Sequence, residues 1–258
     1  MKITKIEKKK KLYLVEFDSI DKIYVTEDTI VRYMLSKNMI IEENLLTEIK
    51  EFSQYSHGKN LALYYISFKQ RTENEVRTYL INHDIDQKII PKILQDLVDS
   101  KWINDKEYVT NFLQQNLSSG DKGPYVLKQK MFQKGIPSQL IDDALVKIDL
   151  SPVSEKLADK LLDRYSSKYP SNILKEKITK NLVDKGFNYQ DAKKTVETLT
   201  IEKNETNEKE LIYKEIDKAY HRYSKKYDGY ELKKRLIQAL MRKGFVFDDI
   251  NKALTEYL

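Results

Sequence analysis

The chain has 258 residues, of which 33% are charged and 40% hydrophobic, and its formal net charge is +6. Its 7 glycines and 5 prolines are too few for a turn-rich all-β protein. Cysteine is absent, which excludes disulfides, thiolate metal sites and cysteine nucleophiles. The sequence opens with charged residues and has no apolar run of about 20 residues, so we expect no signal peptide, no membrane contact and a cytoplasmic location.

Three short runs rich in β-branched and aromatic residues open the chain. They cover residues 3–7, 12–17 and 22–25, separated by a basic turn at 8–11 and a break at Asp18–Ser19. A lone hairpin is marginal in water, so we predict a small three-stranded antiparallel sheet. From Thr26 onward the apolar spacing becomes that of a helix, and residues 1–58 are predicted to form an N-terminal unit of sheet plus helices.

From about residue 60 the chain repeats itself. Lys134–Gly135, Lys185–Gly186 and Lys243–Gly244 each follow apolar residues placed four and eight positions before the glycine. Asp84 occupies the same place in the earliest copy. These four positions, called the pivots below, are 51, 51 and 58 residues apart. A period near 50 residues is typical of helical repeat proteins.

Each pivot lies just beyond a helix, where the chain often adopts a left-handed conformation that glycine accepts without steric cost. Asp84 is a reasonable substitute because aspartate visits this region more readily than most residues. The lysine before each glycine pivot lies in the last helical turn, where a cation meets the negative end of the helix dipole. We therefore interpret Asp84, Gly135, Gly186 and Gly244 mainly as structural residues.

The apolar register continues beyond each pivot, and a further helix precedes it. These preceding helices are expected near residues 60–69, 104–117, 152–168 and 205–226. Helix start signals occur in several places: capping-box patterns at 72–75 and 104–107, and a proline after Ser151. The predicted fold is mainly α: an elongated array of about four tandem three-helix repeats behind the N-terminal sheet and helix cap. The predicted repeats are residues 59–100, 101–149, 150–200 and 201–258, with 202–208 either a loop or a helix extension.

No catalytic pattern is present. The three histidines lie far apart, Gly120 and Gly123 lack the Lys-Ser/Thr of a phosphate-binding loop, and carboxylates alternate with lysines as solvated helix faces. We expect no enzyme activity, metal or cofactor. Many of the 18 tyrosines occupy apolar positions of the preceding helices. They suit either a core with its hydroxyls in water or stacking on nucleic acid bases.

Basic residues lie along the second helix of each repeat, the one that ends at the pivot. If the repeats stack with a constant rotation, equivalent helices line one face and a recurring cation forms a stripe. The sequence is equally consistent with a second interpretation, in which these lysines only keep exposed helices soluble. The candidate partner- or DNA-binding residues are Arg71, Arg77, Lys122, Lys128, Lys130, Lys134, Lys185, Arg235, Arg242 and Lys243.

Residues 71–136 resemble the RecX family, bacterial regulators of the RecA recombinase. The resemblance lies in the order and spacing of a basic-polar opening at 71–76, the aromatic turn and acidic residues of 102–108, the helix start at Gly123–Pro124 and the pivot at 134–136. The sequence departs from the family at Lys101, where the family usually has glycine. The fourth repeat and N-terminal sheet resemble the longer form of low-GC Gram-positive bacteria.

The resemblance implies a non-enzymatic regulator, expected as a monomer, that acts in DNA repair, recombination and the SOS response. Its implied partners are RecA and the groove of RecA–single-stranded DNA filaments, where it would limit strand exchange, ATP turnover and co-protease activity. Direct contact with single- or double-stranded DNA is left open. Two alternatives remain: a helix-turn-helix reader of duplex DNA, and a repeat scaffold for an unrelated protein.

Overall fold

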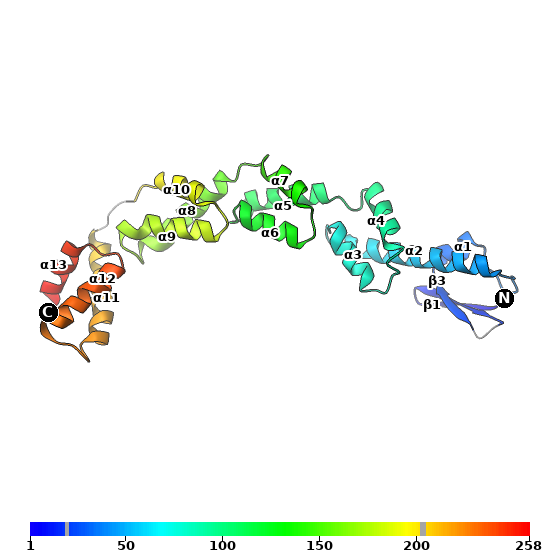
Figure 1. Cartoon of the computed structure of the whole chain (residues 1–258), viewed down its shortest axis with the longest axis horizontal. Helices are drawn as coiled ribbons and strands as arrows, with labels where there is room; N and C mark the ends of the chain where they lie inside the picture. Colours follow the sequence, from blue (N-terminus) through cyan, green and yellow to red (C-terminus); the bar gives the residue numbers. More distant parts are fainter. Residues whose placement is uncertain (19–20, 202–204) are drawn as a thin grey trace. The chain divides into compact units, whose positions relative to one another are not determined.

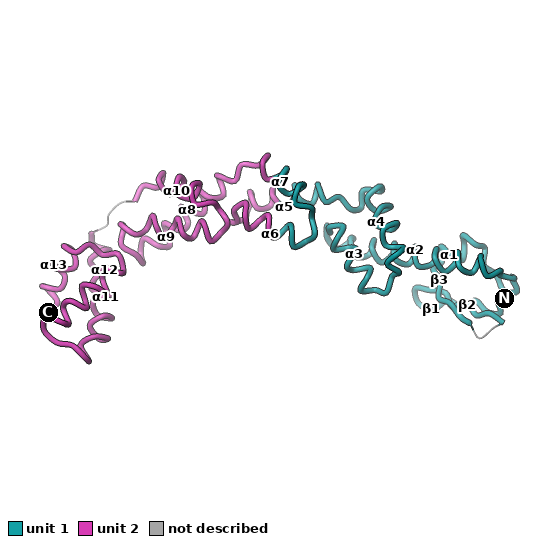
Figure 2. The backbone as a smooth tube through the Cα atoms, in the orientation of Figure 1, with its two compact units in different colours: residues 1–112, 130–144 teal, residues 113–129, 145–258 magenta. Residues whose placement is uncertain are grey.

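The computed structural model describes residues 1–18, 21–201 and 205–258; Ser19 of the predicted break and residues 202–204 of the predicted loop lie outside them. Three strands and thirteen helices follow one another in this described part (Figure 1). The chain divides into two compact units, residues 1–112 with 130–144 and residues 113–129 with 145–258 (Figure 2). Across the described ranges, no helix combines the length and apolar content needed to cross a bilayer.

The N-terminal sheet is confirmed as three antiparallel strands in the order β1-β2-β3. The strands are β1 (Ile3–Lys9), β2 (Leu12–Phe17) and β3 (Lys22–Val25). The basic turn is tighter than predicted, because Lys8 and Lys9 extend β1 and only Lys10 takes a left-handed φ of +46°. Helix α1 (Glu27–Arg32) follows, capped by Thr26. One face of the sheet contributes to a core of Ile3, Val15, Phe17, Val25, Leu35, Ile41, Leu46 and Ile49.

Helix α2 (Glu43–Ser67) is a single helix of 25 residues where the sequence predicted two. The predicted boundary between residues 58 and 59 therefore lies inside it. Gly58 is buried in the middle of α2, and a Cβ there would lie 2.6 Å from Ile93 Cδ1. The missing side chain lets α2 approach the first repeat closely, which explains why glycine is tolerated inside this helix.

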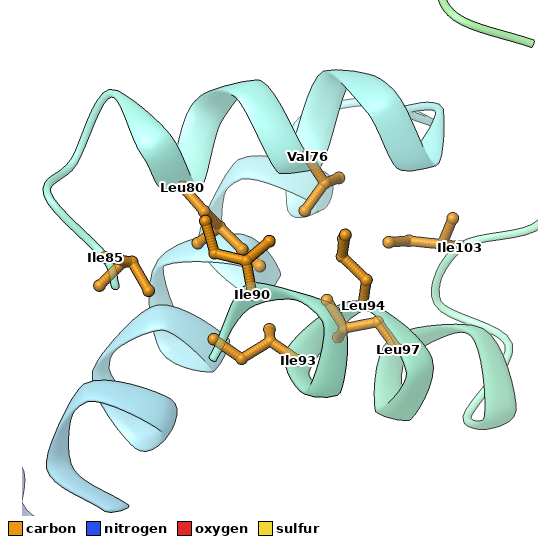
Figure 3. Close-up of a cluster of buried hydrophobic side chains, with 9 residues drawn as sticks. Val76, Leu80, Ile85, Ile90, Ile93, Leu94, Leu97 and Ile103 are labelled. Carbon is orange, nitrogen blue, oxygen red and sulfur yellow. The ribbon is translucent and has the colours of Figure 1, made fainter. Parts of the chain in front are cut away.

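The first repeat is completed by α3 (Glu73–Ile81) and α4 (Ile90–Asp99). Its side chains at the predicted apolar positions point into one core (Figure 3). Val76 and Leu80 of α3 and Leu97 of α4 are fully buried. The core comprises Ala62, Val76, Leu80, Ile85, Ile90, Ile93, Leu94, Leu97 and Ile103.

Nine further helices form three more repeats, so the described residues contain the four predicted groups. The second repeat has α5 (Asp105–Ser119), α6 (Pro124–Gln133) and α7 (Ser138–Leu145). The third has α8 (Ser151–Ser166), α9 (Ser171–Asp184) and α10 (Tyr189–Glu197). The fourth has α11 (Glu205–Tyr223), α12 (Gly229–Arg242) and α13 (Phe247–Tyr257). The mainly α fold with a small N-terminal sheet is thus confirmed.

Candidate interaction surfaces

All four pivots adopt the predicted left-handed backbone conformation. Their φ angles are +58° at Asp84, +79° at Gly135, +97° at Gly186 and +91° at Gly244. In each copy the N–H after the pivot donates to the carbonyl five residues earlier. This bond closes a Schellman motif, which satisfies a carbonyl left free at the end of the helix. The pivots therefore end the second helices as the sequence predicted.

The glycine pivots also lie against the start of the second helix in the preceding repeat. An added Cβ at Gly186 would lie 2.7 Å from the backbone nitrogen of Val126 in α6. The carbonyl of Lys185 accepts a hydrogen bond from the N–H of Gly123 at 2.8 Å. The carbonyl of Gly186 accepts one from the N–H of Tyr125 at 3.0 Å. The negative end of one helix thus meets the positive end of another, and the pivot joins two repeats.

The other two glycine pivots make corresponding contacts. A Cβ at Gly135 would collide with the side chain of Asn74 in the first turns of α3. A Cβ at Gly244 would collide with Ile173 Cγ2 in the first turn of α9. Glycine is therefore required at these positions by close approach of the next helix as well as by φ.

Three of the predicted binding lysines form ion pairs at these junctions. Lys134 Nζ lies 2.6 Å from Glu75 Oε1 in α3. Lys185 donates to the Asp121 carboxylate just ahead of α6. The hydrogen bonds from Lys185 and from Lys122, which lies 2.9 Å away, lower the pKa of Asp121 to about 2. These three lysines therefore have carboxylate partners within the fold.

Three of the predicted arginines make contacts within their own repeats. The Arg71 guanidinium lies 3.9 Å from the ring centroid of Tyr65. Arg77 and Arg235 each pair with the glutamate four residues earlier on the same helix, at 2.8 and 3.2 Å. Such exposed pairs contribute little to stability, because water screens them.

The remaining predicted cations are less constrained. Lys130 on α6 and Arg242 on α12 are exposed, whereas Lys128 on α6 is half-buried. Lys243 is exposed and lies 3.6 Å from Glu215 of α11. Among the ten predicted residues, Lys130 and Arg242 are thus well placed to meet a partner without breaking an ion pair of the fold.

The second helices share an exposed apolar side chain, three residues before each pivot, that the predictions did not include. The exposed fractions are 42% for Ile81, 62% for Phe132, 39% for Val183 and 52% for Met241. A single exposed apolar residue is ordinary on a protein surface, but its recurrence at one register position in four copies is not. The repeat alignment itself carries this signal, since the position is apolar in every copy.

These features define a class of protein: a tandem array of three-helix repeats, joined at left-handed pivots and preceded by a small antiparallel sheet. Three domain models of one family match it, the first, second and third three-helix domains of RecX, at residues 59–97, 104–145 and 207–254. Regulatory protein RecX of Streptococcus mutans is 59% identical over 258 residues, and that of Streptococcus agalactiae is 56% identical, with 100% of both chains covered. The chain belongs to the RecX family.

A crystal structure of regulatory protein RecX is similar over 76% of this chain and 97% of that one. The TM-score is 0.60 and the sequence identity 28%. Helices α8–α10 lie between the residues matched by the second and third domain models. The third repeat is thus a three-helix group placed between two matched domains.

Proposed function

We propose that this chain is a non-enzymatic regulator that binds the RecA recombinase and RecA–single-stranded DNA filaments and limits their activity in DNA repair. Its similar relatives carry the name regulatory protein RecX. The observation that supports a filament as partner is the apolar side chain exposed at the same register position of all four repeats. A partner built from identical subunits can engage such a surface several times, and linked contacts strengthen one another.

The chemistry of these side chains favours a protein surface over nucleic acid bases. Phe132 is the one aromatic of the four, whereas Ile81, Val183 and Met241 have no aromatic face and cannot stack on bases as the side chains of single-strand binders do. They can enter apolar pockets of a protein, where buried anchors dominate the binding energy. Lys130 and Arg242 lie on two of the same helices and can steer the chain toward an acidic surface.

The test is a titration of the chain against RecA, RecA–single-stranded DNA filaments and naked DNA, each at two salt concentrations. We expect binding to filaments together with inhibition of their ATP hydrolysis. No binding to RecA in either form contradicts the proposal. Sequence-specific binding of duplex DNA in the absence of RecA supports the helix-turn-helix alternative instead.

Two surface variants locate the contact. Val183→Ser combined with Met241→Ser should weaken filament binding by about tenfold, because two apolar anchors of about 1 kcal/mol or less each are lost. Val146→Ser is the matched control, since Val146 is 87% exposed but lies outside this register. Equal binding by the double variant and the control rules out this surface, and circular dichroism checks that both fold.

The role of the cations is tested with Lys130→Glu combined with Arg242→Glu. This variant should slow association with filaments and reduce its salt dependence, because charges near an interface act mainly on the association rate. Lys134 is left unchanged, because reversing its charge would set it against Glu75 and disturb the junction between two repeats. Unchanged association kinetics would show that these cations do not face the filament.

A further inference from the structure

A row of cations lies on α8, a helix that the sequence prediction did not single out. Lys156, Lys160 and Arg164 are spaced four residues apart, so they share one face with steps of about 6 Å along the helix. All three line a groove of about 450 Å³. The rest of the lining comes from residues 118–121 at the end of α5 and just beyond it, from Asn181 and Lys185 at the end of α9, and from the more buried residues of α8.

The three row cations have no carboxylate partner within the residues that the structure describes, in contrast to the junction lysines. The acidic residues of α8, at positions 155, 159 and 163, do not line the groove, although Asp159 and Asp163 lie three positions after Lys156 and Lys160 and so about 60° from them around the helix. Asp121 is the one carboxylate in the lining, and Lys122 and Lys185 already bind it. The groove therefore carries a net positive charge.

Proximity of like charges supports an anionic occupant. Arg164 lies close enough to Lys185 for its charge to oppose the protonation of that lysine, although the hydrogen bond to Asp121 dominates and raises the Lys185 pKa. Like charges that line one groove repel one another in water. An anion bound between them relieves this repulsion, which adds to its own attraction to each cation.

The lining favours a phosphate backbone over an acidic protein segment. Its apolar members, Val153, Leu157 and Leu161, are 3%, 8% and 3% exposed, so none offers an anchor at the surface. Protein interfaces depend on such anchors, and especially on aromatic ones. Nucleic acid interfaces instead depend on lysine and arginine contacts to phosphates. The lining has no aromatic side chain for base stacking, so binding should be independent of sequence.

We propose that this groove binds the sugar–phosphate backbone of a single DNA strand, with Lys156, Lys160 and Arg164 contacting successive phosphates. The cations form one line, which suits the successive phosphates of one strand. The row of cations belongs to the third repeat, between the residues matched by the second and third domain models. The inference does not rest on recombinase binding, because it needs DNA alone.

The experiment is a fluorescence anisotropy titration of the whole chain with a labelled oligothymidine, across a series of salt concentrations without RecA. The variant Lys156→Gln, Lys160→Gln, Arg164→Gln should bind more than tenfold more weakly at low salt. The slope of log K against log salt should fall in magnitude by about 2, since each lost phosphate contact on a single strand removes about 0.7. The single variant Lys160→Gln should lower the magnitude of this slope by about 0.7. It provides a test of the site that remains valid if the triple variant misfolds.

The matched control is Lys175→Gln, Lys177→Gln, Lys180→Gln on α9. It removes the same charge from three exposed lysines of the same repeat, outside the groove. It should change both affinity and slope much less. Equal losses in the two triple variants would overturn the groove site in favour of a general charge effect.

Two further outcomes would also overturn the inference. One is the absence of oligothymidine binding by the unaltered chain. The other comes from competition with unlabelled molecules. If duplex DNA of the same sequence, or polyglutamate, displaces the labelled oligothymidine at a lower concentration than unlabelled oligothymidine does, the groove does not prefer a single strand. RecA binding by the α8 variant, measured in parallel, separates failure of this site from failure of the proposed function.

Discussion

Lys101 has a left-handed φ of +60° in the turn between α4 and α5. The N–H groups of Trp102 and Ile103 both donate to the Leu97 carbonyl, at 2.8 and 3.1 Å, and so fix this turn. A residue with a Cβ is strained there by about 1–2 kcal/mol, whereas glycine is not. We expect Lys101→Gly to raise the free energy of unfolding by up to about 1 kcal/mol, with the greater freedom of unfolded glycine offsetting part of the gain. Urea unfolding measures it.

The same substitution at a helical lysine supplies the control. Lys214 is exposed in the interior of α11, so Lys214→Gly should lower the free energy of unfolding by about 1 kcal/mol. Opposite signs at the two positions would establish that φ, and not loss of a lysine, determines the effect. A destabilising Lys101→Gly would contradict the strain argument.

Asp121 gives the fold a dependence on acid. Hydrogen bonds from Lys185 and Lys122 hold its pKa at about 2, below the ordinary value of 3.8. Because the folded-state pKa is depressed, the stabilisation is complete above about pH 4 and is lost as the pH falls toward 2. The Asp121→Asn variant should therefore lose less stability than the parent between about pH 4 and pH 2. Thermal unfolding at a series of pH values measures it, and a variant with the full acid sensitivity of the parent would refute the assignment.

At the scale of single residues, the sequence predicted conformations better than partners. The left-handed pivots followed from local rules about glycine and helix ends. The partners of Lys134 and Lys185 lie 59 and 64 residues away in the chain, so spacing gave no hint of them. These two cations, predicted to face a partner, are consequently paired across the junctions between repeats, and the row on α8 was overlooked.

The strands and helices were predicted correctly where neighbouring residues in the sequence determine them. All three strands were predicted from β-prone runs, and only the length of β1 differs. Helix α2 was missed as one helix because Gly58 lowers helix propensity at its middle. The contact with Ile93 that compensates for this comes from the first repeat, and no local pattern could reveal it. Tertiary packing therefore explains why α2 continues through Gly58.

The start of α3 combines a helix cap with a junction between repeats. Thr72 Oγ1 accepts from the Glu75 N–H at 3.2 Å, in the predicted capping box, and donates to the Lys134 carbonyl at 2.8 Å. Thr72→Ala removes both bonds. It should cost about 2 kcal/mol, since a lost cap alone costs about 1 kcal/mol and a partly buried carbonyl loses its donor. Urea unfolding measures this cost.

Two threonine variants test whether the hydroxyl is responsible. Thr72→Ser retains the oxygen and should remain close to the parent in stability. Thr78→Ala lies in the exposed middle of α3 and should be neutral or slightly stabilising, because alanine is the better helix former. If Thr72→Ala were no more costly than Thr78→Ala, the junction would not depend on this contact.

For the whole chain, the 50-residue period predicted the repeats but not how consecutive ones meet. The pivot contacts join residues 60 to 71 positions apart, and the recurring glycine does not show in the sequence which helix it meets. Each repeat nevertheless has apolar positions of its own, and the described cores of the N-terminal unit, the first repeat and the fourth repeat are distinct clusters. Stability in such proteins is a sum of local terms and nearest-neighbour terms.

This local organisation predicts local unfolding. Leu236 is fully buried in the fourth-repeat core, so Leu236→Ala should cost about 2–5 kcal/mol there. Native-state hydrogen exchange should show that backbone amides of α11–α13 lose protection. The loss should extend no further than the start of α9, and the amides of the N-terminal sheet should keep the protection that they have in the parent. Leu80→Ala, in the first-repeat core, should show the reverse pattern. Protection lost along the whole chain in either variant would show that the repeats unfold as one cooperative unit.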